Sequence, residues 1–491
     1  MVTLKVSSGF EIAKTFGWLC LMLATVALLS QPGASQDEWF HASSIWCGHG
    51  KREVYCPETV RVNGSIAEVK TNFSVTGCSA QPKYPLVCAP SEQGITSTAN
   101  AGIRPGLFYF VLSWVVVPSV NVSLLLARLL NAVLVSIFLG FLMWLLPGRH
   151  RAALFLTCLV ILPVTGSFLL SSVNPESWNA LGTGIGWLAV HAAITCGSLP
   201  KRQRIALAAV GVVAVIMAVG SSWDSIPMLL FISVLVGIQM VSTNRVSSRL
   251  RLFLQCQFLI GTGVLLAEAS SGPSPLGTLT SFLRYLWDQP NSVTSLAASA
   301  LQKVPSVLDA LGTVPTMNSL ILPELVYVSG VLIFGLVMFK GLDSQSMWQK
   351  IGLTSIAVFS ALLLVRQDMV FDYRAMHTID PLYTFPLLMF AIAWWQLMGP
   401  FDLFERVSSS LNLIIGLATT TFLLAQFTVV ERFTDRQSYG IRMVPDGPDD
   451  WWWSWMPISP TISVVLATYF LWRYLQAAKS FVAATNDAQI S

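Results

Sequence analysis

Residues 123–146 read SLLLARLLNAVLVSIFLGFLMWLL, an almost unbroken apolar run in which Arg128 is the one charged side chain. As an α-helix rising 1.5 Å per residue, a run of this length measures about 36 Å. The hydrocarbon core of a bilayer is about 30 Å thick. The run therefore predicts a helix that crosses a membrane.

The composition of the whole chain agrees with this prediction. Of its 491 residues, 54% are hydrophobic and 11% are charged, whereas about 25% of residues are charged in a soluble domain. Lipid offers the backbone no hydrogen-bond partners, so spanning segments must be helices or closed barrels, and runs near 20 residues indicate helices. Beyond Lys201, Arg202 and Arg204 the basic residues do not cluster, so we predict no nucleic-acid partner.

We predict an all-α integral membrane fold with about 12 spanning helices. The chain divides into a first transmembrane helix or signal anchor (1–31), a large extracytoplasmic loop (32–122) and a multi-helix transmembrane domain (123–491). Within the loop, 107–118 is too short to cross and is predicted to lie in the membrane interface. The predicted spans are 16–31, 123–146, 152–171, 178–198, 205–222, 226–241, 252–268, 319–339, 351–366, 383–398, 409–430 and 460–476.

The short loops give the orientation. Those near 149–151, 201–204, 245–251 and 340–350 carry Lys and Arg and fall on one side, which the positive-inside rule assigns to the cytoplasm. We therefore predict a multi-pass protein of the plasma membrane with both termini cytoplasmic and with the lipid bilayer as a partner. Small residues at 34–35 leave cleavage of the first helix as an alternative, which would move only the N-terminus outside.

Four cysteines lie in the long loop, at Cys47, Cys56, Cys78 and Cys88. An even number of cysteines in an oxidising compartment predicts two disulfides. Three pairings are open, and we prefer Cys47 with Cys56 and Cys78 with Cys88, which are nearest in sequence. A metal site is the alternative, but neither pair has the C-x-x-C spacing.

An acidic segment, Gln36-Asp37-Glu38-Trp39-Phe40-His41, follows the first helix. It places two carboxylates and an imidazole at the predicted boundary between water and lipid. An enzyme that uses a lipid-linked sugar needs its acceptor hydroxyl beside a carboxylate base at this level. The alternative is an ordinary outer loop with charges near a helix end.

This segment resembles the Asp-Glu-x-x-His motif that follows the first helix in a bacterial family of predicted multi-pass membrane proteins of unknown function. That family is itself similar to GT-C glycosyltransferases. The sequence departs from the family pattern at Gln36, Trp39 and Gly106, which replace prolines, and in the order Tyr-Arg before Pro381. Further stretches carry the resemblance in the same order along the chain: 104–109, 127–130, 171–176, 311–327 and 373–374.

The resemblance implies catalytic roles for three residues. Asp37 is the expected base, Glu38 is the substitute candidate, and His41 is expected to orient the base or the acceptor. Some enzymes of the GT-C type use Mg²⁺ or Mn²⁺, which carboxylates and waters hold. The sequence shows no dedicated cage, so we predict no essential metal.

The donor phosphate needs a cation at the interface, and the fork of arginine suits phosphate oxygens. Arg104 and Arg374 are the candidates, and anchoring to lipid headgroups is the alternative for both. Arg128 lies within a predicted span, where arginine usually faces a partner or a cavity. A structural ion pair and a role in the site are therefore equally open for Arg128. Asn174 and Glu176 form a second tier, although Asn-Pro is also an ordinary turn signal.

We expect a GT-C-type glycosyltransferase that moves a hexosyl or pentosyl group from a polyprenyl-phosphate donor to a glycan or protein acceptor outside the cell, in envelope glycan assembly. A polysaccharide polymerase or ligase is one alternative, but such enzymes place their key residues in a later outer loop. A transporter or flippase of lipid-linked sugars is another. Transporters are often built from repeated halves, and no repeat is evident here.

Overall fold

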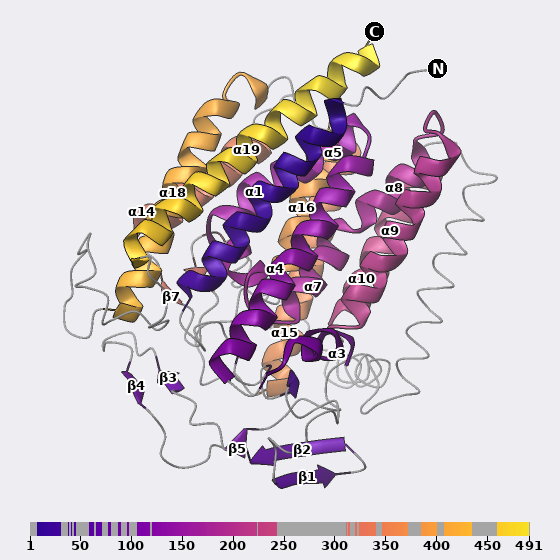
Figure 1. Ribbon diagram of the computed structural model, residues 1–491. Coiled ribbons are helices and arrows are strands. Elements are labelled where there is room, and N and C mark those ends of the chain that lie inside the picture. Colours follow the sequence, from indigo (N-terminus) through magenta and orange to yellow (C-terminus); the bar gives the residue numbers. More distant parts are fainter. Residues whose placement is uncertain are drawn as a thin grey trace.

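The fold is described from a computed structural model of the chain. It describes residues 7–30, 106–117, 120–222, 224–242, 324–339, 346–371, 384–399, 407–434 and 459–490, with shorter pieces at 38, 41, 44–45, 58–62, 65–70, 77–79, 87–89, 96–97, 311, 313–314 and 320–321. In these residues the protein is predominantly helical, and the long helices form one bundle (Figure 1).

The bundle is made of long helices and of shorter helical pieces that follow one another directly. In chain order they are α1 (Ser7–Leu29), α3 (Leu107–Leu112), the 3₁₀ turn η2 (Ser113–Val115), α4 (Val120–Leu145), α5 (Gly148–Ile161), η3 (Leu162–Gly166), α6 (Ser167–Leu170), α7 (Glu176–Asn179), η4 (Ala180–Ile185), α8 (Trp187–Thr195), α9 (Lys201–Val219), α10 (Ser225–Ser242), α14 (Glu324–Phe339), α15 (Met347–Phe371), α16 (Phe385–Met398), α18 (Leu411–Thr434) and α19 (Pro460–Ile490).

Helices occupy each of the predicted spans except 252–268, which lies outside the described residues. Within the described residues, four helical segments are long and apolar enough to cross a membrane by length and composition: Val122–Leu145, Gly148–Leu170, Lys201–Val219 and Leu411–Val430. A helical membrane protein is thereby confirmed, whereas the count of about 12 spans stays a prediction. The stretch 107–118, predicted to lie in the membrane interface, contains α3 and η2.

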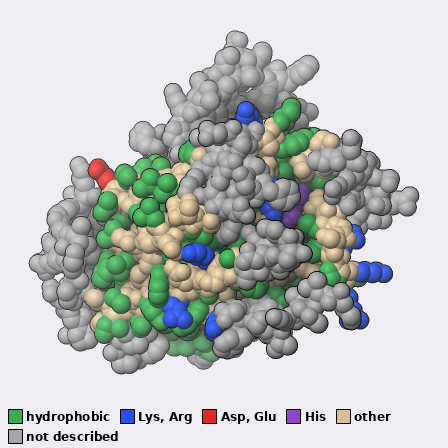
Figure 2. Space-filling model, turned by 90° about the horizontal axis from the view of Figure 1, so that it is seen from above, with side chains coloured by type: hydrophobic (Ala, Val, Ile, Leu, Met, Phe, Trp, Pro, Cys, Tyr) green, Lys and Arg blue, Asp and Glu red, His purple; other side chains and the backbone are tan. Residues whose placement is uncertain are grey.

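The helix α1 packs along both α4 and α19. The start of α1 and the end of α19 lie at the same end of the bundle, which we call the terminal end (Figure 1). At the opposite end α1 leads into the long loop, and we call this the first-loop end. Figure 2 looks onto the terminal end, where most of the charged side chains drawn are Lys and Arg. The cytoplasmic position of that end stays a prediction.

A helical hairpin lies in the centre of the bundle. Its first arm is α5, η3 and α6, its second arm is α7, η4 and α8, and the turn 171–175 joins them at the first-loop end. The most apolar stretch of the first arm is completely buried. Both arms contain a π-helical segment, LPVTG at 162–166 and ALGTGI at 180–185. Proline and glycine within these segments account for the irregular turns.

The second arm of the hairpin packs closely on its neighbours because it lacks side chains at the contacts. A Cβ on Gly182 would lie 2.2 Å from the Ala214 carbonyl oxygen, and one on Gly186 would lie 2.3 Å from the Ala214 Cβ. On the other side, a Cβ on Gly184 would lie 2.8 Å from the Met389 Cβ. Small residues therefore let η4 approach α9 and α16, as is common between helices in membranes.

Helix ends in the bundle are capped by side chains from other helices. The last carbonyls of a helix have no partner within it, and lipid supplies none. Arg151 donates to the carbonyls of Met143 and Trp144 at the end of α4, at 2.8 and 3.1 Å. Arg204 donates to Ala193 near the end of α8 at 3.0 Å. The positive charge of arginine also suits the negative end of a helix dipole.

Short strands occur between the helices. They are β1 (Glu58–Val62), β2 (Ser65–Lys70), β3 (Gly77–Ser79), β4 (Val87–Ala89), β5 (Thr96–Ser97), β6 (Thr313–Val314) and β7 (Leu320–Ile321). The sheet order is β1-β2-β5, and β3-β4 and β6-β7 form separate antiparallel pairs. In the β3–β4 pair, Cys78 and Cys88 are direct register partners.

Candidate functional site

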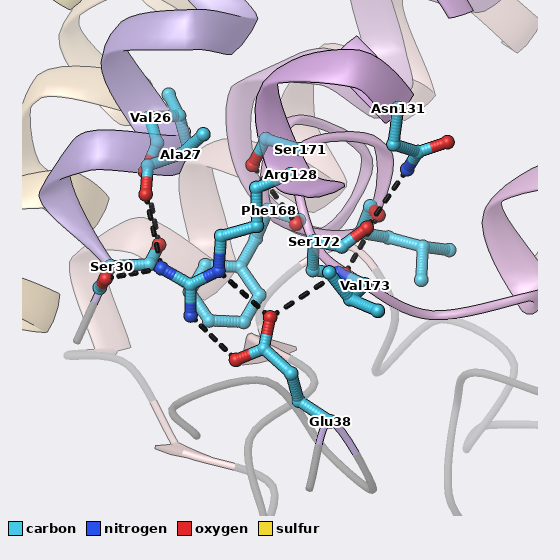
Figure 3. A network of polar contacts seen from close by, with 11 residues as sticks. Val26, Ala27, Ser30, Glu38, Arg128, Asn131, Phe168, Ser171, Ser172 and Val173 are labelled. Carbon is cyan, nitrogen blue, oxygen red and sulfur yellow. Dashed lines mark hydrogen bonds and ion pairs between the residues drawn. The ribbon is translucent and has the colours of Figure 1, made fainter. Parts of the chain in front are cut away.

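Arg128 of α4 forms a bidentate ion pair with Glu38 at the first-loop end. Its Nε donates to Glu38 Oε1 at 2.8 Å and its Nη2 donates to Oε2 at 2.5 Å (Figure 3). Both side chains are fully buried. Parallel bonds of this kind fix the orientation of a carboxylate as well as its position. The sequence predicts a partner or a cavity for Arg128 without identifying it, and the structure shows that the partner is Glu38.

The same guanidinium holds the end of the first helix. Arg128 Nη1 donates to the carbonyl oxygens of Ala27 at 3.0 Å and Ser30 at 2.5 Å, which lie at the end of α1 (Figure 3). One side chain thus fastens Ser30 and Glu38, the residues on either side of the segment 31–37. We call this set of contacts the Arg128 clamp. It fixes Glu38 of the acidic segment relative to the end of α1 and to α4.

The clamp continues into the turn of the central hairpin. The backbone N–H of Val173 donates to Glu38 Oε1 at 3.2 Å. Asn131, one turn after Arg128 on α4, donates through Nδ2 to the Ser172 carbonyl at 2.8 Å (Figure 3), and its Oδ1 accepts from Trp178 Nε1 at 2.9 Å. The helix α4 therefore holds the acidic segment through Arg128 and the hairpin turn through Asn131.

The second-tier residues Asn174 and Glu176 lie in this turn and are buried. Asn174 Oδ1 accepts the Glu176 backbone N–H at 2.9 Å. The carboxylate of Glu176 accepts from Asn179 Nδ2 at 2.7 Å and from Ser222 Oγ at 2.9 Å. Ser222 follows α9, so Glu176 ties the hairpin to that helix.

His41 joins the acidic segment to the short helix α3. Its Nδ1 lies 2.9 Å from the hydroxyl of Tyr109 on α3, and the two rings stack with their centroids 5.9 Å apart. The N–H groups of Leu107 and Phe108 donate to the Gly220 carbonyl at 3.1 and 3.3 Å. The helix α3 is thus fixed to the end of α9 while it contacts the acidic segment.

On the outer surface of α3 and η2, Phe110 is 40% exposed and Trp114 is 71% exposed. Their rings meet edge to face at 6.0 Å. Aromatic side chains of this kind favour the level of the lipid headgroups. The position of this stretch in the membrane interface stays a prediction.

Of the residues predicted for the site, the structure brings together Glu38, His41, Arg128, Asn174 and Glu176. The other predicted residues, Asp37, Arg104 and Arg374, lie outside the described residues, as do Cys47 and Cys56. Both disulfides stay predictions, and the strand register suits the pair Cys78 and Cys88 because opposed residues have Cα atoms about 4.5–5.5 Å apart, within the range that a disulfide bridges. Within the part of the chain that the structure describes, no group of three or more His, Cys, Asp or Glu side chains suits a metal, and metal dependence stays untested.

Asn131, Tyr109, Ser222, Trp178 and Asn179 belong to the site but are not predicted from the sequence as site residues. Asn131 and Tyr109 belong to the stretches 123–146 and 104–109, which stand out for other reasons, and Ser222 gives no signal. A polar Asn within an apolar span is the one cue that is present, because such a side chain must find partners in lipid.

A family model described as a predicted membrane protein (DUF2142) matches residues 20–391 of the chain. No curated protein and no solved structure matches the chain. The matched range contains the Arg128 clamp, α3 and the central hairpin.

Proposed function

The chain belongs to this family of predicted membrane proteins, and on that premise we propose that it is a GT-C-type glycosyltransferase. The donor is a sugar linked to polyprenyl phosphate, and the acceptor is a glycan or protein on the outer side of the plasma membrane. The reaction joins the anomeric carbon of the sugar to an acceptor hydroxyl oxygen. The polyprenyl phosphate leaves, and the hydroxyl proton passes to a carboxylate base.

The observation that carries the proposal is the Arg128 clamp. Asp37 immediately precedes Glu38 in the chain, and the Glu38 carboxylate is held by Arg128 and by the Val173 N–H. A catalytic group must be held within a fraction of an ångström of its working position, which requires support from neighbouring residues. A buried ion pair beside an acidic residue is a support of this kind.

The clamp also divides the roles of the two carboxylates. Glu38 already accepts hydrogen bonds at both oxygens from a permanent cation, so taking a proton there would break the pair. Asp37 is therefore the base in our proposal, and Glu38 is a positioning residue. This narrows the expectation from the sequence, which kept Glu38 as a substitute base.

The membrane interface lies close to the acidic segment in this arrangement. His41 contacts Tyr109 of α3, and the other face of α3 exposes aromatic side chains. A lipid-linked donor has its tail in the bilayer and its phosphate at the interface, so a base near an interfacial helix is well placed for it. Arg104, three residues before α3, is our first candidate for the donor phosphate and Arg374 is the second.

The proposal is tested by incubating the purified protein with a synthetic polyprenyl-phosphate sugar and an acceptor glycan. We expect a new glycosidic product and free polyprenyl phosphate in equal amounts. A flippase would instead move the intact donor across a vesicle membrane, which a fluorescent donor and an impermeant quencher detect. Translocation without transfer would replace the proposal with that alternative.

A further inference from the structure

At the end of the central hairpin opposite its turn, two histidines join the two arms. His150 lies near the start of α5 and His191 lies near the end of α8, so each belongs to a different arm, at the terminal end of the bundle. His150 Nε2 and His191 Nδ1 are 2.9 Å apart. The side chains are only 5% and 6% exposed. This contact lies at the opposite end of the hairpin from the turn that meets Glu38.

The neighbours of the pair assign its protons. His191 Nε2 lies 3.4 Å from Gln239 Oε1, an acceptor on α10, so the His191 proton belongs on Nε2. Thr195 Oγ1 lies 3.4 Å from His191 Nδ1, but its hydrogen is used in the shorter bond to the His191 carbonyl, at 2.7 Å. The remaining nitrogen, His191 Nδ1, is then a lone-pair acceptor and His150 Nε2–H is its donor.

The surroundings of the pair favour two neutral rings. Trp187 packs edge to face on His191 with ring centroids 5.9 Å apart, and Trp187 in turn contacts Phe390 and Trp394 of α16. Arg149 directly precedes His150 in the chain, and its guanidinium donates to the Gly399 carbonyl. From α9, the nearby cation Arg204 donates to Ala193. Among the described residues, the polar contacts of the two rings involve no carboxylate. Arg151 follows His150 on α5, and Cys196, whose Sγ lies 3.7 Å from Thr195 Oγ1, follows the end of α8.

An added proton is therefore opposed in the closed hairpin. One imidazolium would be a buried cation beside Arg149, and two would place N–H groups against each other across the 2.9 Å contact. Both difficulties disappear when the hairpin end opens to water. The opened form then binds more protons than the closed form, so acid shifts the equilibrium toward opening.

We propose that His150 and His191 form a proton-controlled latch that closes the open end of the hairpin. The latch holds at neutral pH and releases as the medium at the terminal end becomes acidic. The turn 171–175, which meets Glu38 through Val173, is carried by the same two arms. This inference does not depend on the proposed transfer reaction.

The test is hydrogen exchange measured by mass spectrometry between about pH 8 and pH 5, the range over which imidazole changes charge. Exchange in peptides covering 148–195 is divided by exchange in α18, which cancels the intrinsic pH dependence. We expect the ratio to rise about tenfold in acid, the change that loss of one buried hydrogen bond brings to an opening equilibrium.

Two variants make the result specific. The double variant His150→Gln with His191→Gln keeps a donor facing an acceptor but cannot titrate, so its ratio should stay constant with pH. His49→Gln removes a histidine outside the latch and should behave like the wild type. A constant ratio in the wild type, or an equal rise in the double variant, would overturn the latch.

If the double variant does not fold, ¹⁵N-imidazole NMR of the wild type decides. The chain contains 5 histidines, so their spectra can be assigned. Both histidines of the latch should carry their neutral proton on Nε2 and should titrate together. Independent titration, or a proton on His191 Nδ1 at neutral pH, contradicts the inference.

Discussion

Arg128 and Glu38, 90 residues apart in sequence, form an ion pair that joins the long loop to the helices, and both side chains are fully buried. Removing charges from water is costly, and two parallel hydrogen bonds and the further bonds to Ala27, Ser30 and Val173 offset part of this cost. An interaction of this kind is sensitive to the loss of either partner. It therefore gives the first prediction.

Glu38→Gln should destabilise the protein by about 3–5 kcal/mol, because it leaves the Arg128 charge buried without a counter-ion. Arg128→Gln should cost at least as much, since the carbonyls of Ala27 and Ser30 also lose their donor. The double variant should be more stable than the sum of the two single effects implies. Thermal or denaturant unfolding in detergent measures all three. Additive effects would show that the two side chains do not stabilise the fold as a pair.

Close packing of the hairpin on α9 predicts a difference between two glycines. Gly182→Ala places a methyl group 2.2 Å from the Ala214 carbonyl oxygen, so the helices must separate, at a cost of about 1–3 kcal/mol. On α18, a Cβ added to Gly416 would meet no atom within 4 Å, and Gly416→Ala should be neutral or stabilising by up to about 1 kcal/mol. Equal unfolding temperatures for both variants would be inconsistent with the packing.

The strand register of β3 and β4 predicts a disulfide between Cys78 and Cys88. A bridge that closes a loop of about ten residues contributes roughly 2–3 kcal/mol in the chain-entropy model. Mass spectrometry of unreduced peptides should find Cys78 linked to Cys88, and Cys47 linked to Cys56. Four free thiols in protein prepared from an oxidising compartment would refute both bridges.

The charge distribution predicts that the α8–α9 connection and the loop near Ser438 lie on opposite sides of the membrane. Arg202 is exposed, whereas its neighbour Gln203 donates to the Leu145 carbonyl at 2.7 Å, so Arg202→Cys is the less disruptive labelling site. In a background without other cysteines, an impermeant maleimide on intact cells should label Ser438→Cys but not Arg202→Cys. Labelling of both would disprove this topology.

The helices of this protein are predictable because their signal is local. A run such as 123–146 is apolar over the full width of a bilayer, and nothing but a helix satisfies its backbone there. The π-helical segments are not predicted, although Pro163 and the glycines of 182–186 mark both places. Whether a proline bends, breaks or widens a helix depends on neighbours that come from elsewhere in the chain.

Several members of the candidate site are predictable from the sequence, whereas their connections are not. Arg128 is expected to face a partner because an unpaired charge in a span is costly. That the partner is Glu38, and that one guanidinium also caps α1, depends on three-dimensional packing across 90 residues. The link between His41 and Tyr109 is hidden for the same reason. The Asn-Pro signal predicts a turn at Asn174, and this side chain does shape the turn through Glu176.

The most direct test of the proposed function is the rate of sugar transfer by Asp37→Asn, compared with Asp224→Asn. Both variants replace one acid by its amide, but Asp224 lies in the turn before α10 and has no part in the proposed reaction. Transfer from the polyprenyl-phosphate donor is measured with purified, folded protein, and donor binding is followed separately. We predict that Asp37→Asn lowers the rate by about 10²–10⁴ if proton transfer limits turnover, with donor binding and thermal stability retained, while Asp224→Asn transfers at the wild-type rate. Transfer at the wild-type rate by Asp37→Asn would contradict the assignment of Asp37 as the base.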